Sequence, residues 1–283
     1  MSAKRIPGQA TTDFTSLYDR LTGRDMAIVE ALSRHRVFTS DMLTELFFPS
    51  GWSARSRILT LTEMEILARF RQDNRAAYRY TLGYWGAAIF AWKRRETPPT
   101  KKAVAANIHR LAVSGHRAHL EGVNAFFVDL TAGARAHGGL KVKEWLCEEE
   151  AAALFLGKIR PDGAARLVVD NEKWLPVVSR EDTRKQLPFF FEHDTGTETL
   201  DVLIGKLSRY AEKPSREGYR PVLMQLTRRG REENLHHRLA AVHYPFPVAT
   251  TSATTGVLGT VWRVQGRIGK FHLTELMTRR EGL

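Results

Sequence analysis

Residues 187–210 constrain the fold most, because a buried strand and an amphipathic helix follow each other there. Phe189-Phe190-Phe191 is an apolar run too short for a free-standing helix, and it is typical of a buried β-strand. Thr195-Gly196 ends the strand, and Thr197 is placed to cap a helix. The apolar residues of that helix recur at helical spacing: Leu200, Leu203, Ile204, Leu207 and Tyr210.

Three polar residues close the predicted strand: Glu192, His193 and Asp194. Because side chains alternate along a strand, Glu192 and Asp194 share one face and His193 points to the other. Two carboxylates side by side repel each other, so we expect a cationic group beside them.

Length and charge limit the class of protein. A chain of 283 residues is long enough for two modest domains. Its net charge of +12, from 43 Lys+Arg and 31 Asp+Glu, favours a polyanionic partner such as nucleic acid. The single cysteine, Cys147, excludes a disulfide scaffold and fits a reducing compartment. The sequence has no apolar run near the ~20 residues of a membrane span and no signal peptide, so we expect a cytoplasmic protein with no membrane partner.

The first part of the chain predicts a winged helix-turn-helix domain over residues 20–92, after a flexible leader over residues 1–19. Three short helices are expected to begin near Thr22, Thr39 and Ser53, each at a hydroxyl cap, with Asp25 completing a capping box. A β-hairpin over residues 67–71 and 77–82 follows. Residues 93–102 are basic, contain a Pro pair and predict a linker to a second domain over residues 103–283.

The third helix of a winged helix enters the major groove, and residues near its start read base edges. The predicted base-reading residues are Ser53, Arg55, Ser56, Arg57 and Thr60. The predicted phosphate contacts on the hairpin are Arg71, Arg75 and Arg79. Residues 51–102 contain 11 Lys/Arg and four Asp/Glu, so 11 − 4 = +7 of the net charge falls in this segment, as phosphate neutralisation requires. The alternative is a winged helix that contacts protein, with solvated arginines.

The second domain is expected to begin with one long helix over residues 103–136. A strand (140–146), a short helix (147–156), a hairpin (158–162 with 166–169), the strand and helix described above, a strand (221–226), a helix (228–239) and a strand (247–251) follow. We interpret the long helix's His109, His116 and His119 as satisfied or exposed side chains, because no second cluster of ligands accompanies them.

Asp162, in the segment Arg160-Pro161-Asp162-Gly163, precedes Glu192 by thirty positions. Asp162, Glu192 and Asp194 together would offer the hard oxygen ligands that Mg²⁺ or Mn²⁺ prefers, for a metal that activates water in phosphodiester cleavage. Lys206 is a candidate catalytic group that reaches back from the following helix. The alternative is a structural ion network with Lys206, Arg209 or Arg160. Glu148 and Glu149 are further candidate ligands, although both are typical of a solvated helix start.

Asp162 with Glu192-x-Asp194 resembles the motif of the PD-(D/E)XK nuclease superfamily. The resemblance implies a three-layer α/β/α, restriction-endonuclease-like domain whose second and third strands carry the acids, and so an α+β chain overall. That superfamily usually has a lysine where this sequence has Asp194, and Lys206 would be a relocated lysine.

A larger pattern, made of residues 21–43, 53–70, 160–163 and 189–210, resembles the replication-relaxation family of plasmids and integrative elements in Gram-positive bacteria. This family resemblance implies a role in plasmid replication or conjugative DNA processing, with double-stranded DNA and other replication or conjugation proteins as partners. Three functions stay open: a sequence-specific initiator or accessory factor, a metal-dependent nicking enzyme, and a transcriptional regulator whose second domain is a structural, dimerisation or effector module. A homodimer is compatible with each.

Overall fold

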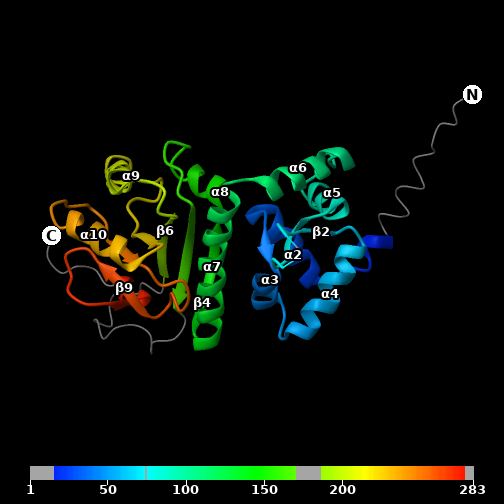
Figure 1. Cartoon of the computed structure of the whole chain (residues 1–283), viewed down its shortest axis with the longest axis horizontal. Coiled ribbons are helices and arrows are strands. Elements are labelled where there is room, and N and C mark those ends of the chain that lie inside the picture. The colour runs from blue at the N-terminus through cyan, green and yellow to red at the C-terminus, as the bar shows by residue number, and fades with distance from the viewer. Residues whose placement is uncertain (1–15, 74, 170–185, 278–283) are drawn as a thin grey trace, which may run out of the picture. The chain divides into compact units, whose positions relative to one another are not determined.

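The computed structural model describes residues 16–73, 75–169 and 186–277. The chain is mixed α and β with two sheets, and it divides into two compact units, Met1–Arg117 and Ala118–Leu283 (Figure 1). Residues 1–15 of the predicted leader lie outside the described residues. No helix within the described ranges is long and apolar enough to span a bilayer.

The first unit opens with three helices that each follow a hydroxyl cap. They are α2 (Gly23–His35), α3 (Ser40–Phe47) and α4 (Gly51–Glu63), and their caps are Thr22, Thr39 and Ser50. The predicted capping box of Thr22 and Asp25 is confirmed. The predicted start of the third helix was wrong by two residues, because the Ser50 hydroxyl accepts the backbone N–H of Ser53 and the helix begins at Gly51.

A three-stranded antiparallel sheet completes this part of the first unit. Strands β2 (Leu67–Phe70) and β3 (Arg79–Leu82) form the predicted hairpin, and β1 (Phe38–Thr39) pairs with β3 to give the order β1-β3-β2. Helices α5 (Tyr84–Lys93) and α6 (Lys101–Val113) follow. Gly83 is the N-cap of α5, and a Cβ there would lie 2.3 Å from the Glu65 carbonyl oxygen, so only glycine fits this close approach.

The second unit is built on a seven-stranded sheet with the order β10-β9-β8-β7-β6-β5-β4. Its strands are β4 (Leu140–Leu146), β5 (Gly163–Val169), β6 (Gln186–Asp194), β7 (Val222–Leu226), β8 (Val248–Thr251), β9 (Thr260–Val264) and β10 (Phe271–His272). β4, β5 and β6 pair antiparallel, β6, β7 and β8 pair parallel, and β9 and β10 add two antiparallel strands.

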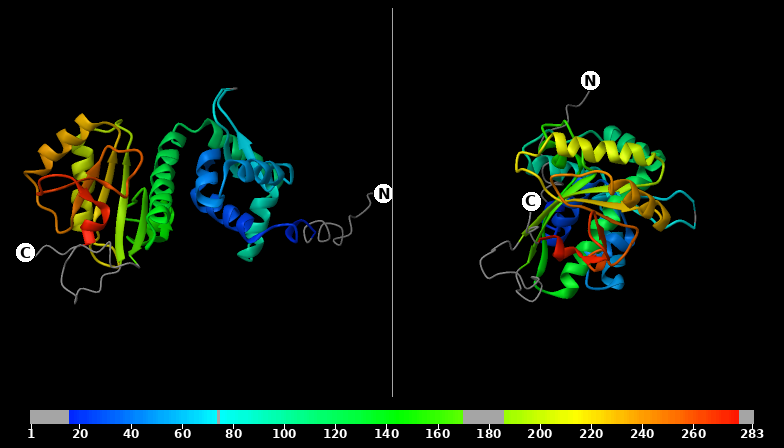
Figure 2. Two further views of the ribbon diagram at one scale, coloured as in Figure 1. Left: turned by 90° about the horizontal axis from the view of Figure 1, so that it is seen from below. Right: turned by 90° about the vertical axis from the view of Figure 1, so that its left-hand side faces the viewer.

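Helices cover both faces of this sheet (Figure 2). Helix α7 (Arg117–His137) and the 3-10 helix η2 (Leu273–Met277) lie on one face, and α8 (Glu148–Ala153), α9 (Leu200–Glu212) and α10 (Arg229–Leu239) lie on the other. The alternation predicted for the apolar run of β6 is confirmed. Phe189 and Phe191 join the core under α7, where Phe126 stacks on Phe191 at 3.8 Å between ring centroids, and Phe190 joins the core under α9.

Three predictions for this part of the chain were wrong. Thr199 rather than Thr197 caps α9, since the Thr199 hydroxyl accepts the backbone N–H of Val202. The single long helix is two helices, because Ser114 leaves α6 with extended backbone angles before α7 begins at Arg117. Residues 158–162 form no strand, since β5 is paired on both sides, by β4 and by β6. Helix α5 and strands β9 and β10 were not anticipated.

Candidate functional site

The outer face of α4 is the first group of candidate residues. Ala54, Ile58 and Leu61 are buried and fix which side of the helix faces the core of the first unit. The opposite side therefore projects into solvent. It carries residues at positions i, i+3, i+4 and i+7, here called the α4 face: Trp52, Arg55, Ser56 and Leu59.

Only two of the five predicted base-reading residues belong to the α4 face, namely Arg55 and Ser56, and both are exposed. The other three bond within the protein. The Ser53 hydroxyl donates to the Ser50 carbonyl at 2.9 Å, and the Thr60 hydroxyl donates to the Ser56 carbonyl at 3.1 Å. The Arg57 side chain extends from α4 towards α2.

Arg57 forms an ion pair with Asp25, which is fully buried. Its Nε lies 3.0 Å from Oδ1 and its Nη2 lies 2.5 Å from Oδ2, while the backbone N–H and hydroxyl of Thr22 each donate to Oδ2 at 2.7 Å. Burial raises the pKa of Asp25, but the hydrogen bonds from Arg57 and Thr22 outweigh it and leave that pKa below its ordinary value. Arg57 therefore joins α4 to the start of α2.

The β2–β3 hairpin carries the predicted phosphate contacts. The guanidinium groups of Arg69 and Arg71 lie over the ring of Tyr78, at 4.6 and 4.8 Å from its centroid. Arg71 and Arg75 are exposed, and Arg79 donates to the Ala77 carbonyl at 2.9 Å. The hairpin thus presents several cations around one aromatic ring.

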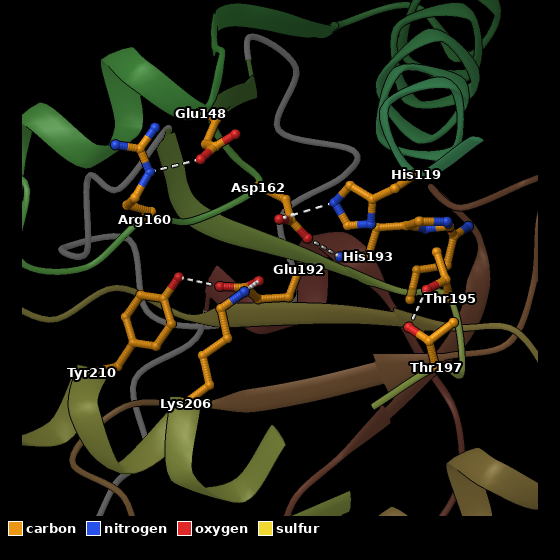
Figure 3. A network of polar contacts seen from close by, with 11 residues as sticks. His119, Glu148, Arg160, Asp162, Glu192, His193, Thr195, Thr197, Lys206 and Tyr210 are labelled. Carbon is orange, nitrogen blue, oxygen red and sulfur yellow. Dashed lines mark hydrogen bonds and ion pairs between the residues drawn. The ribbon is translucent and has the colours of Figure 1, made fainter. Parts of the chain in front are cut away.

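The second group lies on two neighbouring inner strands of the large sheet, where Asp162 directly precedes β5 and Glu192 lies two residues before the end of β6 (Figure 3). The Asp162 carboxylate accepts the backbone N–H of His193 at 2.7 Å and lies 3.1 Å from His119 Nε2. Burial raises the pKa of Asp162, but His119 and the charge of Lys206 outweigh it and lower that pKa. The contact with Asp162 likewise raises the pKa of His119 against its burial.

Glu192 is only 3% exposed and is held by two side chains of α9. The Tyr210 hydroxyl donates to Oε1 at 2.5 Å, and the Lys206 ammonium donates to Oε2. Burial raises the pKa of Glu192 to about 8, and the negative charge of Asp162 adds to this effect against the opposing contribution of Lys206. Asp162, Glu192, Lys206 and Tyr210 are called the acid cluster below.

Asp194, the third predicted acid, bonds to α10 instead. Both of its oxygens accept from Arg231, with Nη2 at 2.9 Å from Oδ1, and the Gly196 N–H donates to Oδ1 at 3.1 Å. Over the described residues, no group of three or more His, Cys, Asp or Glu side chains is arranged to hold a metal ion. The structure therefore places Asp162 and Glu192 close enough for their charges to interact, whereas Asp194 forms a separate ion pair with Arg231.

His193 lies on the opposite face of β6 from Glu192, as the alternation predicted. Its Nδ1 lies 3.0 Å from Gln225 Oε1, and the Gln225 amide donates to the Ala253 carbonyl at 2.8 Å. On the far side of the ring, a Cβ at Gly122 would lie 2.2 Å from Nε2, so only glycine leaves room on α7 for this imidazole. Burial and the charge of His119 lower the pKa of His193, whose ring centroid lies 5.5 Å from that of His119.

The sequence did not indicate the roles of two of these side chains, Tyr210 and Arg231. Tyr210 had been interpreted as apolar, although its position four residues after Lys206 puts both on one face of α9. Arg231 carries no local signal, because it is 37 positions from Asp194. The interpretation of His119 as a satisfied histidine is confirmed by its contact with Asp162. Glu148, a further candidate ligand, pairs with Arg160 at 2.7 Å.

The protein-family model described as replication-relaxation matches residues 29–220, which is more than half of the chain. The matched range contains α4, the hairpin and the whole acid cluster. Neither the curated proteins nor the solved structures gave a match.

Proposed function

Because the chain belongs to the replication-relaxation family, we propose that it is a DNA-binding protein of plasmid or mobile-element replication, which recognises a specific double-stranded site through its first unit. The family supports the replication theme. The geometry of the first unit supports DNA as the partner.

The first unit has the element order of a winged helix-turn-helix domain. Three helices precede a two-stranded hairpin, and the short strand β1, between the first and second helices, pairs with the second strand of that hairpin. In such domains the third helix lies in the major groove and presents its solvent side to base edges. Here that side is the α4 face, which is free of contacts with the core of the unit.

The observation that carries this proposal is the exposed pair Arg55 and Ser56 on α4, next in sequence to a cationic hairpin. Arginine reads guanine through O6 and N7, and serine donates to or accepts from several bases. Arg71 and Arg75 on the hairpin are exposed and suit phosphate contacts. One group of side chains therefore supplies specificity and the other supplies affinity.

The test begins with enrichment of duplexes from a random pool by the full chain, followed by binding measurements on an enriched duplex. Arg55→Ala should weaken binding to that duplex by about tenfold or more while leaving binding to a scrambled duplex nearly unchanged. The matched control is Arg110→Ala, which removes an exposed arginine of the same unit from α6. Failure to enrich any sequence would exclude site-specific recognition and favour a winged helix that contacts protein.

Metal-dependent nicking of DNA is a second candidate, favoured by the acid cluster. Apart from the short α8 after β4, the second unit has the element order α7, β4, β5, β6, α9, β7. Its first three strands form an antiparallel meander, and β7 then pairs parallel with β6. This order suits a restriction-endonuclease-like domain, in which the acids sit on the second and third strands. Asp162 directly precedes β5, and Glu192 lies two residues before the end of β6.

The donor set fits a hard divalent cation only in part. Mg²⁺ in phosphoryl-transfer sites is commonly held by one or two carboxylates together with substrate phosphates and waters, and Asp162 and Glu192 match that set. Asp194 is outside it, since Arg231 binds both of its oxygens. When bound, Mg²⁺ or Mn²⁺ supplies Lewis acidity and a more acidic water. Lys206 would then turn from Glu192 towards the phosphate charge, and His119 would hold Asp162 in place.

Incubation of supercoiled plasmid that carries the enriched sequence with Mg²⁺ or Mn²⁺ tests this second candidate. Relaxation should be abolished by Asp162→Asn, whereas Glu148→Gln, which removes an acid paired with exposed Arg160, should relax plasmid like the wild type. Calorimetric titration with Mn²⁺ gives a second readout, since Asp162→Asn should lose binding in the absence of DNA. If the wild type neither binds Mn²⁺ nor relaxes plasmid, the second unit is a structural or dimerisation module of an accessory factor or transcriptional regulator.

A further inference from the structure

The α4 face contains two large apolar side chains that the proposal above does not use. Trp52 is 80% exposed and Leu59 is 47% exposed, and they lie three residues before and four residues after Arg55. Single exposed apolar side chains are common, but large ones that share one helix face are typical of a binding surface. The pattern is therefore a cation between two apolar groups along one helix side.

The spacing of this pattern matches the repeat of DNA. Seven residues of helix, from Trp52 to Leu59, rise about 10.5 Å. Stacked base pairs rise about 3.4 Å each, so the pattern covers about three base pairs. In the major groove the thymine C5-methyl group is the apolar feature and guanine offers the acceptors that arginine binds.

Resting on the proposed DNA-binding function, we infer that Trp52 and Leu59 contact thymine methyl groups on either side of a guanine bound by Arg55. The recognised site is then a short duplex element with a guanine and neighbouring thymines within about three base pairs. Charge complementarity favours DNA as the occupant of this face over a second copy of the chain, because residues 51–102 carry 11 − 4 = +7. Two copies of so basic a segment repel each other.

Replacement of individual thymines of the enriched duplex by deoxyuracil tests the inference without altering the protein. The substitution deletes one methyl group and leaves the hydrogen-bonding edge of the base unchanged. Burial of one methyl group is worth about 0.8 kcal/mol, so the wild type should bind about fourfold more weakly for each contacted thymine. Equal binding of the thymine and deoxyuracil duplexes would overturn the inference.

Trp52→Ala assigns the methyl contact to its side chain. Loss of this apolar contact should weaken binding about tenfold, the lower end for burial of a large apolar side chain, and the deoxyuracil effect at one thymine should disappear. The matched control is Trp92→Ala, which removes another exposed tryptophan from α5 and should keep both affinity and the deoxyuracil effect. A Trp52→Ala protein that keeps the full deoxyuracil effect would overturn the inference.

Two outcomes separate this inference from the proposal on which it rests. Absence of any enriched duplex refutes site-specific binding and removes the inference with it. An enriched duplex that shows an Arg55→Ala effect but no deoxyuracil effect refutes the inference alone. Sedimentation of the wild type and of Trp52→Ala covers the competing occupant, since a wild-type dimer that Trp52→Ala dissociates would assign the α4 face to self-association and overturn the inference.

Discussion

Arg57→Ala should destabilise the first unit without changing which DNA sequence it prefers. Arg57 supplies two of the four hydrogen bonds to the buried Asp25 carboxylate, and Thr22 supplies the other two. Removal of one partner from a buried ion pair costs about 3–5 kcal/mol. Because the Arg57 side chain is 29% exposed and water can partly replace it, we expect the lower end, about 3 kcal/mol.

Hydrogen exchange followed by mass spectrometry measures this loss within the full chain. About 3 kcal/mol corresponds to roughly 100-fold faster exchange of the protected amides of α2 and α4. The matched control is Arg55→Ala, two positions earlier on the exposed side, for which we expect a change within about 0.5 kcal/mol. Arg57→Ala at a temperature where it stays folded should keep the full sequence preference that Arg55→Ala reduces.

The same ion pair sets a dependence on pH. Because the pKa of Asp25 is lower in the folded state than in the unfolded state, its stabilisation is complete above the pKa of a free aspartate. It is lost as pH falls through the lowered value, and Arg57→Ala should flatten this loss. Protection of α2 and α4 that is equal in Arg57→Ala and wild type, combined with loss of sequence preference, would refute the structural role of Arg57.

Three further predictions concern single side chains. Burial raises the folded-state pKa of Glu192 to about 8, so the folded state binds a proton that the unfolded state releases, and stability should fall as pH rises from about 5 to 8. Glu192→Gln should remove this dependence on pH from the free energy of unfolding measured in guanidinium. An unchanged dependence would contradict the assignment. Gly122→Ala places a Cβ 2.2 Å from His193 Nε2 and should lower the stability measured by thermal unfolding by about 1–3 kcal/mol. The control Gly205→Ala, on α9, meets open space and should be neutral or stabilising. Similar effects of the two substitutions would argue against the packing of His193 on α7. Arg75→Ala should weaken binding to enriched and scrambled duplexes alike, and it should reduce the slope of log affinity against log salt by about one. A loss of binding confined to the enriched duplex would instead assign base reading to Arg75.

The features that the sequence predicted correctly depend on neighbours in the chain. Thr22 and Thr39 cap helices because a hydroxyl meets a backbone N–H only a few positions away. The run Phe189-Phe190-Phe191 alternates between two cores because the period of a strand is two. Lys206 lies on the helix that directly follows the strand of Glu192, so a local argument could predict this ion pair.

The features that the sequence did not predict depend on distant partners. The structural role of Arg57 could not be predicted from residues 51–63 alone, since its partner is Asp25 on another helix. Asp194 meets Arg231 because β7 pairs parallel with β6 and the helix after β7 returns along the sheet. The joint between α6 and α7 is an exception, because Ser114 and Gly115 gave a local signal there: glycine in particular disfavours a helix.

The binding ratio between an enriched duplex and the same duplex with its site scrambled tests sequence-specific recognition most directly. It is measured by titration of the full-length wild type at physiological salt, where non-specific contacts to phosphate are weakened. Site-specific reading by the α4 face should give a ratio of about 1,000 or more. A ratio close to one would contradict it.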